Sequence, residues 1–186
     1  IAEDMEIHIG QLEALAYAVE QSGYQRVVLL GMGGSSLAPE LFAKTFGSAP
    51  GYPSLQVLDS TDPQAVSALE SELDYAQTLF VVSTKSGGTE ETLSFFKYFY
   101  NRTVAAVGSR NAGDHFVTIT DPGSKLIELA TSLDFRSIFI NDPNIGGRYS
   151  ALSYFGLVPA ALIRVNLHRL LSSARKMAAD CKPTRP

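Results

Sequence analysis

Two short loops rich in glycine and hydroxyl residues carry the side chains of this sequence that are best suited to holding an anion. The first reads G-M-G-G-S-S at positions 31–36, and the second reads T-K-S-G-G-T at positions 84–89. Glycine lets the backbone approach a ligand closely, and the unpaired N–H groups at the start of a following helix attract negative charge. Either loop by itself is a weak indication, because a plain turn between a strand and a helix can have the same composition.

The second loop is the stronger candidate. Its three hydroxyl groups and one ammonium group belong to Thr84, Ser86, Thr89 and Lys85. Hydroxyls donate to phosphate oxygens, and a lysine adds a positive point charge. The first loop differs from nucleotide motifs, since Ser36 stands where G-x-G-x-x-G needs its third glycine and the P-loop pattern is missing. A dinucleotide-binding domain stays open as a distant alternative, because the acidic residue Asp59 directly follows the second predicted strand.

Arg148 is a third candidate, in the segment G-G-R-Y-S at positions 146–150. A guanidinium group at the end of a strand is suited to stabilising a developing oxyanion. A solvated surface arginine would fit the same residues equally well. The three histidines have no partner pattern, and no metal-ligand spacing occurs, so we expect neither a metal nor a cofactor.

Short apolar runs alternate with helical patterns along the chain, which is typical of repeated strand–helix units. The predicted strands are 27–30, 55–58, 78–83, 116–120 and 137–140. The predicted helices are 4–21, 37–46, 64–73, 90–100, one capped by residues 121–124, and one from 151 to about 179, interrupted at Pro159. Only eight residues separate the apolar run 104–107 from 116–120, too few for a parallel crossover, so 104–107 is predicted as a helix tail or irregular segment.

These elements predict an α/β fold with a doubly wound, five-stranded parallel sheet covered on both faces by helices. In the flavodoxin-like strand order 2-1-3-4-5, strands one and three are neighbours and a crevice opens between them. The two loops would then face each other across one ligand. We divide the chain into an N-terminal helix at 1–26, a phosphate-binding domain at 27–150 and a C-terminal helical extension at 151–186.

Composition narrows the class of protein. The net charge of −4 provides no general attraction for nucleic acid, and no apolar stretch is long enough for a membrane span. Cys181 is the single cysteine and suits a surface thiol, so no intrachain disulfide can form and a reducing, cytoplasmic compartment is expected. The sequence starts with Ile1 rather than Met, which indicates processing or excision from a longer protein.

Three segments resemble the signatures of the first sugar-isomerase (SIS) domain of glucose-6-phosphate isomerases. They read V-V-L-L-G-M-G-G-S-S-L-A-P-E, S-T-K-S-G-G-T-E-E-T and I-G-G-R-Y-S-A-L-S-Y-F-G-L, and they span 27–157 in the family's order. The forms G-M-G-G-S-S-L-A-P-E and D-S-T-D-P are most similar to the isomerase half of bacterial transaldolase–isomerase fusion proteins. The resemblance implies a cofactor-free interconversion of glucose 6-phosphate and fructose 6-phosphate in glycolysis and gluconeogenesis, by a homodimer.

The resemblance also implies roles for individual residues. It implies that the phosphate is bound by Thr84, Lys85, Ser86 and Thr89, and that the sugar contacts Gly34 and Ser35. It also implies that Arg148 stabilises the cis-enediol(ate) and that Glu91 lies near the sugar hydroxyls. Gly87 and Gly88 replace bulkier residues common in the family, which predicts a looser loop. The family's base glutamate, ring-opening histidine and late lysine lie in a second SIS domain and C-terminal segment, beyond Pro186. We therefore expect this chain to bind substrate without turning it over. A non-catalytic SIS module, in a phosphosugar sensor or an amidotransferase, is the alternative.

Overall fold

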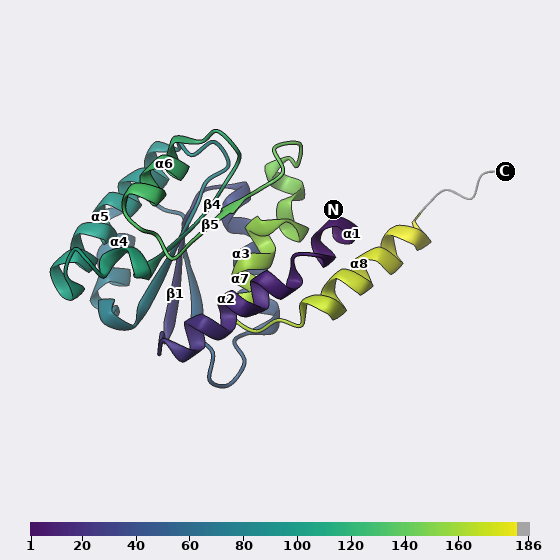
Figure 1. Cartoon of the computed structure of the whole chain (residues 1–186), viewed down its shortest axis with the longest axis horizontal. Coiled ribbons are helices and arrows are strands. Elements are labelled where there is room, and N and C mark those ends of the chain that lie inside the picture. The colour runs from purple at the N-terminus through teal and green to yellow at the C-terminus, as the bar shows by residue number, and fades with distance from the viewer. Residues whose placement is uncertain (182–186) are drawn as a thin grey trace.

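Five parallel strands form one sheet in the order β2-β1-β3-β4-β5 (Figure 1), in a computed structural model that describes residues 1–181. The strands are β1 (Arg26–Gly31), β2 (Ser54–Leu58), β3 (Thr78–Ser83), β4 (Phe116–Thr120) and β5 (Ser137–Ile140). In the register of the central pair, Gly31 at the end of β1 lies opposite Ser83 at the end of β3. The predicted fold class and strand order are confirmed.

Helices cover both faces of the sheet. They are α1 (Ala2–Glu6), α2 (Ile9–Gln21), α3 (Gly34–Phe46), α4 (Pro63–Ser71), α5 (Glu90–Val107), α6 (Lys125–Ser132), α7 (Tyr154–Leu162) and α8 (Leu167–Asp180). Three short 3-10 helices are η1 (Tyr75–Gln77), η2 (Ala112–His115) and η3 (Gly147–Leu152). Figure 1 shows α4, α5 and α6 on one face and α2, α3 and α7 on the other, with α8 extending beside α1. In the described part of the chain, none of these helices is long and apolar enough to cross a bilayer.

The two faces have different cores, because alternate residues of a strand point to opposite sides. On the α4–α6 side, Phe80 lies at the centre and stacks on Phe99 and Phe116, with ring centroids 5.2 and 5.1 Å apart. On the other side the strands pack mainly aliphatic residues against α2, α3 and α7. Val27 to Leu30 are fully buried. The sheet is thereby fixed from both sides, and the loops at its carboxyl edge start from rigid strands.

Most element boundaries agree with the sequence predictions to within a few residues. α5 runs to Val107, so the apolar run 104–107 is a helix tail, as predicted. The expected first helix is split into α1 and α2 around Ile7, and both pieces direct apolar residues, Met5 and Ile9 among them, into one core. Cys181 is an exposed free thiol, as predicted.

The C-terminal region differs from the single interrupted helix that was expected. Pro159 lies inside α7 and does not break it. The break comes later, where Arg164 adopts a left-handed backbone conformation with φ of 65°. Asn166 then starts α8 by accepting a hydrogen bond from the Arg169 N–H at 2.8 Å. The position of the break is therefore set by this turn and cap. Residues 147–152, expected as loop and helix start, form η3.

Candidate functional site

The loops that follow β1 and β3 lie side by side at the carboxyl edge of the sheet, because these two strands are neighbours. Between them is an open cavity of ≈ 430 Å³. Its lining residues are Met32, Gly34, Ser35, Lys85, Ser86, Thr89, Asp121 and Gly147. Five of the six residues for which the sequence suggested phosphate or sugar contacts are among them. The cavity therefore collects hydroxyl, amide and ammonium groups from separate parts of the chain.

The first loop passes directly into α3. Gly33 precedes the helix with φ of 56°, a left-handed value that glycine adopts without strain. Ser36 donates its hydroxyl to the Gly33 carbonyl at 2.9 Å and so tightens the turn. The helix begins at Gly34, three residues earlier than the sequence suggested. The positive end of the α3 dipole consequently lies at the cavity, where it favours an anion.

A third segment packs on the first loop through two glycines. A Cβ atom on Gly34 would lie only 2.7 Å from the carbonyl carbon of Gly147, so no larger residue fits there. The Ser150 hydroxyl fastens the contact, since it lies 2.6 Å from the Gly147 carbonyl oxygen and 3.3 Å from that of Gly34. The G-G-R-Y-S segment is thus held against the cavity by backbone packing.

In the second loop, Thr84 supports the cavity from behind. Its side chain is buried, and its hydroxyl is 2.9 Å from the hydroxyl of Thr89, which does line the cavity. The Thr84 N–H donates to the carbonyl of Ile119, at the end of β4. Ser86 is exposed and accepts from the Gly88 N–H at 3.2 Å. Thr84 is therefore placed to orient Thr89, while Ser86 and Thr89 face the cavity.

Gly87 anchors this loop to the start of α6. Its φ is 67°, and an added Cβ would come within 1.6 Å of the Ser124 hydroxyl oxygen. Gly87 is buried, whereas Gly88 is exposed. A Cβ added to Gly88 would have no neighbouring atom closer than 4.0 Å. The loop is closely packed at Gly87, contrary to the looser loop expected from the sequence. The reason is a contact with a residue 37 positions away, which local composition does not reveal.

The ammonium group of Lys85 is held by two other loops. It forms an ion pair with Asp121, directly after β4, and donates to the Pro143 carbonyl, after β5, at 2.7 Å. The sequence suggested Asp121 only as part of a helix cap. The capping residue is Ser124, which accepts from the Leu126 N–H, and Asp121 lines the cavity instead. Its position just after a strand was the available signal.

Arg148 and Glu91 lie outside the cavity wall. Both side chains are exposed, and within residues 1–181 neither forms a hydrogen bond or an ion pair with another side chain. Arg148 follows Gly147, which does line the cavity, and Glu91 lies in the first turn of α5. The structure therefore brings the phosphate-binding candidates together and leaves these two at the rim. No group of three or more potential metal ligands occurs among the described residues.

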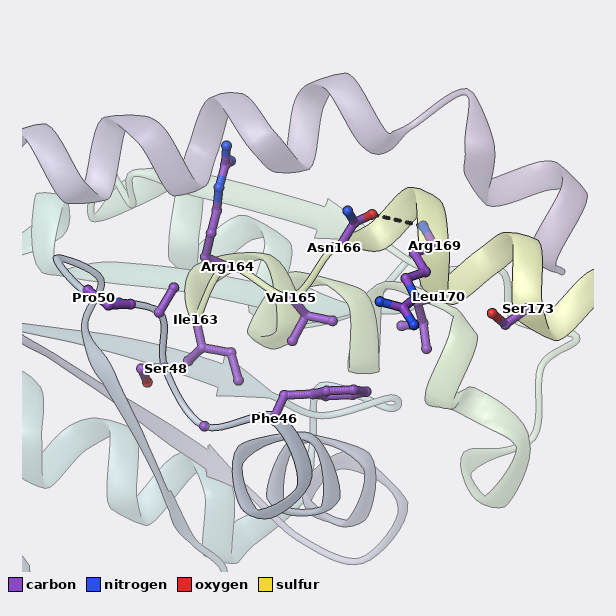
Figure 2. Close-up of a pocket in the computed structure, with 12 residues that line it drawn as sticks. Phe46, Ser48, Pro50, Ile163, Arg164, Val165, Asn166, Arg169, Leu170 and Ser173 are labelled. Atoms are coloured by element: carbon purple, nitrogen blue, oxygen red, sulfur yellow. Dashed lines mark hydrogen bonds between the residues drawn. The ribbon is translucent and has the colours of Figure 1, made fainter.

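A larger hollow of ≈ 690 Å³ lies at the opposite edge of the sheet, between residues 46–50 and the turn that joins α7 to α8 (Figure 2). Apolar side chains such as Phe46, Ile163 and Val165 form much of its wall. In Figure 2 the Arg164 side chain points away from them. The Arg164 guanidinium lies over the ring of Tyr52, 5.5 Å from its centroid. The Asn166 side chain is used in capping α8. The wall also includes the side chains of Arg169, Ser48 and Ser173. The smaller cavity is the better candidate for an anion site because two loops that lead directly into helices meet there.

The chain is similar to known proteins over most of its length. The family model described as "Phosphoglucose isomerase" matches residues 12–184. A glucose-6-phosphate isomerase from Carboxydothermus hydrogenoformans is 34% identical over 95% of this chain and 40% of its own length. A hypothetical protein from Thermus thermophilus matches with a TM-score of 0.85 and 30% identity, covering 98% of this chain and 43% of that one. A glucose-6-phosphate isomerase structure from Chlamydia trachomatis has a TM-score of 0.76 and 27% identity, covering 91% and 32%. The chain thus spans less than half the length of these proteins.

Proposed function

Because the chain belongs to the phosphoglucose isomerase family, we propose that it is the phosphosugar-binding domain of an enzyme that interconverts glucose 6-phosphate and fructose 6-phosphate. One observation carries the proposal: two loops from neighbouring strands line a single cavity of ≈ 430 Å³ with hydroxyl groups and a lysine. Its volume lies within the range usual for small-ligand sites. Its polar groups are mostly donors, which is what phosphate oxygens require.

Within this proposal the second loop holds the phosphate, through the hydroxyls of Ser86 and Thr89, the Lys85 ammonium and the start of α5. The first loop meets the sugar through Gly34 and Ser35. Thr84 acts through Thr89, because their hydroxyls are paired. Arg148 stabilises the negative charge of a cis-enediolate, and Glu91 lies near the sugar hydroxyls. These last two roles require the sugar to extend from the cavity toward the rim.

The chain by itself is proposed to bind without catalysing the isomerisation. Moving a proton from C2 needs a positioned base. Among the described residues that line the cavity, none is a glutamate or a histidine, and the one carboxylate, Asp121, is paired with Lys85. We place the base in a further part of a longer protein, which we propose to be a cytoplasmic homodimer acting in glycolysis and gluconeogenesis. A link to transaldolase fusions stays a prediction.

Binding can be tested by nuclear magnetic resonance with the isotope-labelled chain. We expect glucose 6-phosphate and fructose 6-phosphate to shift the amide signals of Ser86, Gly87 and Gly88. The amide signals of the residues that line the larger hollow should not shift. Glucose without phosphate is the control and should shift none of them. Equal shifts with glucose, or shifts confined to the larger hollow, would contradict the assignment of the site.

Catalysis can be tested in a coupled assay that follows fructose 6-phosphate formation. The 186-residue chain should show no rate above the background at a concentration where it binds the sugar phosphate. A longer protein containing this chain should isomerise glucose 6-phosphate without added metal or nucleotide. Full activity in the chain alone would overturn the division of binding and base between two parts, and binding without activity in the longer protein would favour a phosphosugar sensor.

A further inference from the structure

Asp121 is a carboxylate in a cavity whose other polar groups are suited to an anion. Among the described residues of the cavity wall, Lys85 is the only cation and Asp121 the only anion, and the two are paired. The pair is held in place by the backbone as well, because the Asp121 N–H donates to the Lys85 carbonyl at 3.0 Å. A negative charge at a fixed position beside a phosphate site must affect how strongly that site attracts anions.

The Asp121 side chain is also poorly solvated. It is 15% exposed, and its Oδ1 atom is buried without a hydrogen-bond partner among the described residues. Water therefore screens this carboxylate less than it would screen a surface one. The Lys85 side chain is 36% exposed and already donates to Asp121 and Pro143. Its charge is largely balanced before any ligand arrives.

Among the described residues, the cavity wall contains no second cation. Glu90 and Glu91 occupy the first turn of α5, beside the same loop, and both are exposed. Arg148 lies at the rim and does not line the cavity. A phosphate group would consequently depend on hydroxyls, amides and helix dipoles, whose effect requires a close geometric fit.

Resting on the proposed phosphosugar site, we infer that Asp121 determines its anion affinity: it balances the charge of Lys85, weakens the attraction for anions in general and leaves recognition to the hydrogen-bonding loops. Asp121 is in this sense a specificity-determining residue. Removing its charge strengthens the binding of any phosphate at this cavity. If Asp121 served only to hold Lys85 in place, its substitution would instead weaken the binding of phosphate.

The test compares the unchanged chain with Asp121→Asn in titrations with glucose 6-phosphate and with inorganic phosphate, followed by the amide signals of the second loop. Asparagine has nearly the same size and can still accept from Lys85, so mainly the charge is lost. We expect Kd to fall about tenfold for both ligands, which is the effect of one like charge at roughly 6 Å in a partly solvated site. The gain should shrink as salt is added.

Asp59→Asn is the matched control, because Asp59 follows β2 at the same edge of the sheet, is exposed and does not line the cavity. It changes the net charge equally and should alter Kd less than twofold. A second comparison uses Lys85→Met with and without Asp121→Asn. Lys85→Met leaves the Asp121 carboxylate without a positive partner. The double variant with Asp121→Asn should therefore have a Kd at least threefold lower than that of Lys85→Met alone.

The outcomes separate this inference from the proposed function. An unchanged chain that binds glucose 6-phosphate, with a Kd that is unaltered or raised in Asp121→Asn, overturns the role of Asp121 while the phosphosugar site stands. An unchanged chain with no response to glucose 6-phosphate removes both. If Asp121→Asn tightens binding no more than Asp59→Asn does, the effect belongs to the net charge, and the inference is wrong.

Discussion

The two hollows of this molecule differ in a way that volume does not reveal. The larger, at ≈ 690 Å³, lies at the amino edge of the sheet and is bounded by apolar side chains together with Arg169, Ser48 and Ser173. The smaller, at ≈ 430 Å³, lies at the carboxyl edge and is lined by hydroxyls and a lysine. The difference teaches that loops leading directly into helices, rather than the size of a hollow, make the better candidate for an anion site.

The contrast follows from the topology of a parallel sheet. Every strand of such a sheet ends at the same edge, so the beginnings of the following helices gather there. α3 and α5 both start at the smaller cavity and direct the positive ends of their dipoles toward it. At the opposite edge the chain turns back into strands, and α8 begins behind its own asparagine cap. Four predictions test this contrast.

The largest expected effect comes from Gly87→Ala, which tests whether the smaller cavity is held by close packing. The new Cβ would come within 2.8 Å of the Ser124 Cβ at a left-handed φ of 67°. We expect the free energy of unfolding to fall by about 3 kcal/mol, measured by urea denaturation. Gly88→Ala is the control and should cost less than about 1 kcal/mol, because its Cβ would lie in open space. Equal costs for both would mean that the contact with α6 does not constrain the loop.

The next effect is on binding. Lys85→Ala should weaken the affinity for glucose 6-phosphate roughly thirtyfold, a loss of about 2 kcal/mol, because a charge-assisted contact disappears and the Asp121 carboxylate loses its partner. Titration calorimetry measures the change, and circular dichroism verifies that the variant is folded. An unchanged affinity would show that the second loop is not the phosphate site.

Ser86→Ala should have a smaller effect of the same kind. Ser86 lines the cavity and is exposed, so its hydroxyl is proposed to contribute one hydrogen bond to the phosphate. One such bond has a net value of about 1 kcal/mol, or roughly fivefold in Kd. The same calorimetric titration measures it. A loss as large as that of Lys85→Ala would mean instead that Ser86 shapes the turn, since it also accepts from the Gly88 N–H.

The smallest effect is expected at the larger hollow. Phe46 is 52% exposed there, and Phe46→Ser removes much of its apolar wall. We expect the affinity for glucose 6-phosphate to stay within twofold and the free energy of unfolding to fall by less than about 1 kcal/mol. The titration used for Lys85→Ala is the readout. A clear loss of affinity would show that the two edges of the sheet are coupled and that the larger hollow takes part in binding.

Much of the fold could be predicted because its signals are local. Short apolar runs mark the strands, and the spacing between 104–107 and 116–120 excluded one false strand. The second loop stood out because hydroxyls and glycines follow a strand directly. One error lies where a distant contact decides, since the tight packing of Gly87 comes from Ser124. The other has a local cause: the helix break expected at Pro159 comes at the Arg164 turn, which the Asn166 cap follows.

The amino-acid sequence alone determined which elements form, which loops bear anion-binding groups and which family the signatures resemble, because hydrophobic periodicity and loop composition act over a few residues. Only the tertiary structure decided that Asp121 stands in the cavity wall, that Thr84 lies behind it and that Gly34 touches Gly147. The Lys85–Asp121 and Gly34–Gly147 contacts join residues 36 and 113 positions apart, and no local pattern encodes such contacts.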